Sequence, residues 1–76
     1  MNRDRRAQIT AITDQLDALK YDLESIMDEE QEYLENMPEN LQSGEKATAA
    51  EEAVSSLSEA MDNIDSAMES ASNAAE

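Results

Sequence analysis

The 76-residue sequence contains no cysteine, histidine, tryptophan or phenylalanine, and it has only one glycine and one proline. Without cysteine no disulfide can form, and without cysteine or histidine the usual zinc ligand sets are missing. The commonest general base and the thiol nucleophile are missing too, and carboxylate pairs such as Glu29 and Glu30 would lie on a solvated helix. We therefore expect no enzyme activity, no metal site and no cofactor.

Basic residues are also scarce, with 5 against 19 acidic residues and a formal net charge of −14. Such a balance repels nucleic acid and anionic membranes and favours basic protein partners. No run approaches the ~18 apolar residues of a transmembrane helix, and no apolar segment follows the charged start as in a signal peptide. We expect a cytoplasmic protein that binds neither nucleic acid nor a membrane.

The single proline and the single glycine stand close together in the middle of the chain. Pro38 cannot continue a helix from Met37, because its ring clashes with the preceding turn and it has no amide hydrogen. Gly44 supplies a second break. We predict one domain over residues 1–76, with a first helix over about 3–36, a hinge over 37–43 and a second helix over about 44–74. Ser43 and Thr48 are the candidates for capping the second helix.

Both predicted helices carry apolar residues at alternating steps of three and four, the heptad signature of paired helices. We assign Ile9 to position a and Ile12 to position d of the first helix, and Ala47 and Ala50 to a and d of the second. A seven-residue connection makes two helices antiparallel neighbours. The predicted fold is therefore all-α: an antiparallel helical hairpin, or two-helix coiled coil.

The short hinge also predicts a register, in which a residues of one helix face d residues of the other. The seam pairs are Ile26 with Val54, Leu23 with Leu57, Leu19 with Met61, Leu16 with Ile64 and Ile12 with Met68. Glu30 then lies across from Ala50 near the end of the bundle, where its carboxylate reaches water. Three arginines, Arg3, Arg5 and Arg6, come to lie beside the C-terminus of the second helix, near Glu69 and Glu76. We expect Leu41 to fold back over Met37, Leu34 and Ala47.

One hairpin leaves part of its apolar surface uncovered. The g column of the second helix is all alanine, and Met27, Leu34, Met61 and Met68 would be partly covered at best; the alanines are Ala53, Ala60, Ala67 and Ala74. Two helices of this size bury too little to be robust alone. We expect a homodimer that forms a four-helix bundle, or docking on a partner.

Acidic side chains cover the opposite faces of both helices, mainly at positions b and f. Carboxylates three or four residues apart on a helix stand about 5–6 Å from one another, a spacing comparable with that of DNA phosphates. Tyr21 lies among them where no core explains it, so it is a candidate contact residue. The alternative is that the charges only keep the protein soluble. The candidate partner-binding residues are Asp14, Asp17, Tyr21, Glu24, Asp28, Glu32, Glu35, Glu52, Glu59, Asp62 and Glu69.

The hinge and its approach, EEQEYLENMPENLQ over residues 29–42, resemble a recurrent signature in small acidic coiled-coil proteins encoded by bacteriophages, prophages and other mobile elements. The resemblance implies a hairpin and a phage or prophage origin, and it supplies no catalytic or binding residues. By analogy with that setting, we expect a non-enzymatic protein that binds a basic host protein, most concretely a DNA-mimic inhibitor of a defence nuclease of the anti-CRISPR or anti-restriction kind. The alternative is a structural module that oligomerises or docks on a virion or replication protein.

Overall fold

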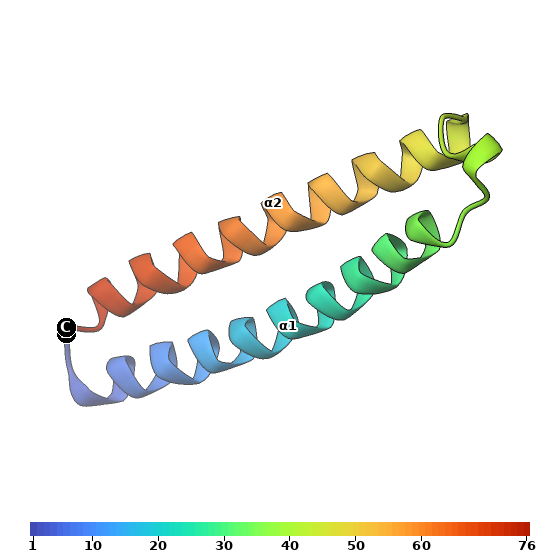
Figure 1. The fold of residues 1–76 in the computed structure, drawn as a ribbon. Coiled ribbons are helices and arrows are strands. Elements are labelled where there is room, and N and C mark those ends of the chain that lie inside the picture. Colours follow the sequence, from blue (N-terminus) through green and yellow to red (C-terminus); the bar gives the residue numbers. More distant parts are fainter.

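The computed structural model describes all 76 residues as two long antiparallel helices joined by a tight connection (Figure 1). Helix α1 spans Arg3–Glu35, the 3-10 turn η1 spans Glu39–Leu41, and helix α2 spans Glu45–Ala74. The molecule is a rod with extents of 59 × 15 × 12 Å. Both termini lie at one end of the rod and the hinge lies at the other. The predicted all-α helical hairpin is confirmed.

The two helices begin in different ways. The side chain of Asn2 caps α1, because its Oδ1 accepts a hydrogen bond from the backbone N–H of Arg5 at 2.8 Å. Helix α2 begins after Gly44, whose backbone is extended (φ −83°, ψ 179°). Because glycine has no side chain, this residue cannot cap the first turn. Neither Ser43 nor Thr48 acts as the cap; the Thr48 hydroxyl instead donates to the carbonyl of Gly44 at 3.2 Å. No side chain therefore caps the N-terminus of α2.

The hinge is held by short-range hydrogen bonds around Pro38. The backbone of Pro38 is extended (φ −55°, ψ 142°), which ends α1, and its carbonyl accepts from the N–H of Leu41 at 2.8 Å. The Gln42 side chain donates to the carbonyl of Met37 at 3.0 Å. Met37 is buried, whereas Leu41 is 52 % exposed; both residues line the same concavity at the hinge. The η1 turn closes on Pro38 and leaves about half of the Leu41 side chain exposed.

The half-buried residues of α1 show which side of this helix faces α2. They recur at positions a and e and are Ile9, Thr13, Leu16, Lys20, Leu23, Met27, Glu30 and Leu34. On α2 the half-buried and buried residues lie at the predicted a and d positions, including Val54, Leu57, Met61, Ile64 and Met68, and also at Ala53 and Ala60 of position g. Helix α1 is therefore turned about its own axis, so that its e column replaces its d column at the seam.

Three residues predicted for the seam consequently lie outside it within one hairpin. Ile12, Leu19 and Ile26, all at position d, are 53 %, 54 % and 52 % exposed. The physical reason is that α1 is apolar at a, d and near the hinge also at e, which makes a stripe wider than one neighbouring helix can cover. At the seam, the e residues Met27 and Leu34 replace the d residues near the hinge, and the e residue Lys20 replaces Leu19 in the middle of the helix.

The interior of the hairpin is small. Only Met37, Ala47 and Ala50 are buried, and all three lie near the hinge. Along the rest of the rod the seam residues are half-covered, because each helix has a neighbour on one side only. Neither helix combines the length and the hydropathy that a membrane-spanning segment requires.

A candidate acidic interaction face

One ion pair identifies the two broad faces of the hairpin. The Lys20 Nζ lies 2.7 Å from Asp65 Oδ1, and both residues occupy position e of their helices. Because the helices run in opposite directions, columns on the same side of the seam in each helix share one face of the hairpin. The e, b and f columns of both helices therefore lie toward the face with the ion pair, and the c and g columns, with d of α1, lie toward the other.

Acidic residues follow this division completely in α2 and partly in α1, where Asp4, Asp22, Glu29 and Glu32 stand at c or g. Every acidic residue of α2 occupies b, e or f: Glu45, Glu51, Glu52, Glu59, Asp62, Asp65 and Glu69. Five acidic residues of α1 occupy b or f: Asp14, Asp17, Glu24, Asp28 and Glu35. We call these twelve residues the acidic face. In α2 no acidic residue stands at c or g, where the chain carries alanine, serine, asparagine and the single lysine Lys46.

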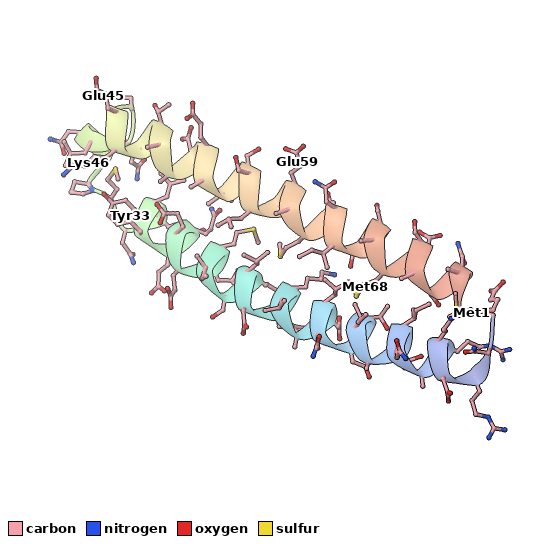
Figure 2. The ribbon with its side chains drawn as sticks, turned by 180° about the vertical axis from the view of Figure 1, so that it is seen from behind. Met1, Tyr33, Glu45, Lys46, Glu59 and Met68 are labelled. Atoms are coloured by element: carbon pink, nitrogen blue, oxygen red, sulfur yellow. The ribbon has the colours of Figure 1, made fainter.

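All the partner-binding residues predicted from the sequence are exposed, and ten of the eleven gather around this face. Tyr21 lies at f among the carboxylates and is 64 % exposed. Figure 2 shows Glu59 directed away from α1, whereas Met68 lies between the helices. Glu32 is the exception, because it occupies position c near the hinge and lies outside the acidic face.

The acidic face is almost free of compensating charge. Asp65 is the only one of the 19 acidic residues that forms an ion pair. The pKa of Lys20 is raised above its usual 10.5, chiefly by the hydrogen bond to Asp65 and further by the charges of Asp65, Asp17 and Glu24, while partial desolvation opposes this shift. The hydrogen bond is thus the main cause of the shift, and the neighbouring carboxylates act in the same direction.

Sequence reasoning missed the e-column members of this face, Glu51 and Asp65, and the role of Lys20. A strict a/d seam places e columns at its margin, so their position depends on the rotation of α1. The opposite charges of Lys20 and Asp65 at matching e positions were a signal that could have found them, because the predicted register places these residues beside the Leu16–Ile64 pair.

A second feature lies at the hinge. An open concavity of about 780 Å³ is lined by Tyr33, Met37, Pro38 and Leu41, with Lys46 and Glu32 among its polar residues. Tyr33 and Lys46 come from different helices and lie at the same end of the rod (Figure 2). No group of three or more acidic side chains in the structure is arranged to hold a metal ion.

Comparison with protein-family models, curated proteins and solved structures finds no match to this chain.

Proposed function

We propose that this protein is a non-enzymatic interaction protein whose acidic face binds a basic surface of a partner protein. Its most concrete form is a DNA mimic that occupies the nucleic-acid-binding surface of a host defence nuclease and inhibits it, as an anti-CRISPR or anti-restriction protein does. One observation carries the proposal: every acidic residue of α2 and five of those of α1 lie on one face of the rod, and all but Asp65 are free of an ion pair.

The segregation argues against charge that serves solubility alone. A purely solubilising surface places charges at all exposed positions and mixes both signs. In α2 the exposed c column carries Ala49, Ser56, Asn63 and Ser70 in place of acids, although each is exposed. The carboxylates are thus concentrated where they add to one another's field, and a concentrated field steers a cationic partner.

The dimensions of the rod also suit a mimic of duplex DNA. Carboxylates at i, i+3 and i+4 stand about 5–6 Å apart along each helix. The rod is 59 Å long, which corresponds to about 17 base pairs at ~3.4 Å per pair. A partner that binds the acidic face in place of DNA should therefore lose binding to a duplex of about this length.

Capture from host lysate tests the proposal. The tagged protein is immobilised, bound proteins are eluted on a salt gradient or with a duplex of about 17 base pairs, and the eluted proteins are identified by mass spectrometry. Replacing Asp17, Glu24 and Asp28 by lysine should abolish capture, because the field at the centre of the face reverses. If capture survives that change and salt hardly affects it, the mimic hypothesis is wrong.

A matched control separates the face from the net charge. The on-face variant Asp17→Asn/Glu24→Gln/Asp28→Asn and the off-face variant Asp4→Asn/Asp22→Asn/Glu29→Gln each remove three exposed carboxylates by the same chemistry. The on-face variant should elute at markedly lower salt than the off-face variant. Equal elution of the two variants would show that net charge alone drives capture.

The second candidate is a structural or assembly module, and the exposed apolar column of Ile12, Leu19 and Ile26 favours it. Under this hypothesis, Leu23→Asp or Ala60→Glu destroys assembly, whereas reversal of the acidic face is tolerated. Under the mimic hypothesis, reversal of the acidic face abolishes partner capture while the helices still form, as circular dichroism would show.

A further inference from the structure

The face opposite the Lys20–Asp65 pair has a different character. Its α1 side is a row of large side chains at d, and its α2 side is a row of alanines at g; the residues are Ile12, Leu19, Ile26 and Tyr33, and Ala53, Ala60, Ala67 and Ala74. The three aliphatic residues of the large row are each more than half exposed. We call these eight residues the neutral face. It consists of a ridge of large residues beside a groove of small ones.

Neutral residues surround much of the two rows. The c column of α1 holds Ala11, Ala18 and Ser25, and that of α2 holds Ala49, Ser56, Asn63 and Ser70. The g column of α1, which borders the large row directly, holds Gln8 and Gln15 followed by two acidic residues, Asp22 and Glu29. An apolar ridge more than half exposed, with neutral residues along most of its length and charges at its margin, is the composition of an interface centre.

We infer that the neutral face is the interface between two copies of this chain, packed with both hinges at the same end and the two-fold axis along the rod. This operation lays α1 of one copy over α2 of the second copy, so the ridge of each enters the alanine groove of the other. A two-fold axis across the rod would instead set ridge on ridge and alanine on alanine, which leaves voids and clashes.

The spacing of the two rows fits the first arrangement. Both rows repeat every seven residues, about 10.5 Å along a helix. In the predicted register Leu19 is level with Met61, so Leu19 of one copy meets Ala60 of the second. By the same register, Ile12 meets Ala67 and Ile26 meets Ala53. Small residues opposite large ones allow helices to approach closely.

The charges at both ends of the rows fit as well. Lys46, the only basic residue of α2, continues the alanine column at g and comes to face Tyr33 of the second copy, beside the acidic Glu29 and Glu32. A lysine over a tyrosine ring and next to carboxylates is favourable. At the other end Arg5 continues the d column and meets the C-terminus of α2, whose free carbonyls attract a cation.

The side of the rod that carries the neutral face is large enough for a stable dimer interface. A face 59 Å long and 15 Å wide offers roughly 900 Å² per copy in plan, against ~800 Å² per partner in a standard stable interface. Stacking through the neutral face also directs the two acidic faces outward and away from each other. The dimer is therefore compatible with the proposed function but does not depend on it.

Sedimentation velocity tests the dimer. We expect wild type at micromolar concentration to sediment with twice the 8.4 kDa of one chain. Leu19→Glu should be monomeric, because it buries a charge against alanine, whereas the control Tyr21→Glu adds the same charge on the acidic face and should remain dimeric. A monomeric wild type, or a dimeric Leu19→Glu variant, would overturn the inference.

Disulfide trapping tests the arrangement and does not require a destabilising charge. The chain has no cysteine, so single-cysteine variants are clean probes. A mixture of Leu19→Cys and Ala60→Cys should oxidise to the mixed dimer, identified by mass spectrometry, because these positions face each other. Ala60→Cys alone should not cross-link, since α2 lies diagonal to α2 of the second copy. Efficient Ala60–Ala60 cross-linking would overturn the hinge-to-hinge arrangement.

Discussion

Replacing Glu30 by leucine should stabilise the hairpin. Glu30 occupies position a of α1, where the other residues from Ile9 to Leu23 are aliphatic, and it is half-buried on the side that faces α2. Ala50, which the register places opposite, is buried. Full burial of a leucine side chain contributes about 1.5–3 kcal/mol, so half-burial at this site should add about 1 kcal/mol to the free energy of unfolding.

Thermal unfolding followed by circular dichroism measures this gain. For a domain of 60–100 residues, 1 kcal/mol raises Tm by about 4–8 °C. The control is Glu24→Leu at position b, which is exposed and far from α2, and which should change stability by less than about 0.5 kcal/mol. If Glu30→Leu is no more stable than Glu24→Leu, then position 30 does not contact α2 and the a/e seam assigned to α1 is incorrect.

Further outcomes are expected at the hinge, at the ion pair and across the whole charged surface. Met37→Ala should lower the free energy of unfolding in urea by about 2 kcal/mol, because it empties the largest buried side-chain position, whereas Leu41→Ala should cost less than about 0.5 kcal/mol. Because the pKa of Lys20 is raised, the ion pair stabilises the fold at any pH below about 10.5, and this contribution is lost as the pH rises through the folded-state pKa. Asp65→Asn should therefore remove this part of the pH dependence of stability above about pH 10. Raising NaCl from about 10 mM to about 0.5 M should increase Tm, because screening weakens the self-repulsion of a net charge of −14 more than it weakens one ion pair; a fall in Tm would contradict this.

The alternation of three and four predicted both helices and their antiparallel packing, because heptad period and a short connection are local properties. It did not predict the rotation of α1. Position d, represented by Leu19, and position e, represented by Met27, lie on either side of the a column, and a stripe that includes both can turn either edge toward one neighbour. Which edge faces α2 depends on contacts between the helices, such as the ion pair of Lys20 with Asp65. The apolar pattern of one helix contains no information on such contacts.

The hinge was predictable in place but not in detail. Pro38 ends α1 by its covalent geometry alone, so its effect follows from its identity. The partial exposure of Leu41 depends instead on the η1 turn that closes on the Pro38 carbonyl, whereas apolar character alone suggested burial. For the acidic face, the b and f members follow from the heptad assignment, whereas Glu51 and Asp65 become members only once the rotation of α1 is known.

The side-by-side termini determine how the rod responds to mechanical force. Tension applied between the two ends of the chain loads the seam at one point, so the helices separate layer by layer from the open end, and each step breaks only a few half-buried contacts. Tension applied between the termini and the hinge runs along the helix axes, so it loads the backbone hydrogen bonds of the helices and not the seam between them. We expect the first geometry to open at much lower force, and Met37, Ala47 and Ala50, at the closed end, to separate last.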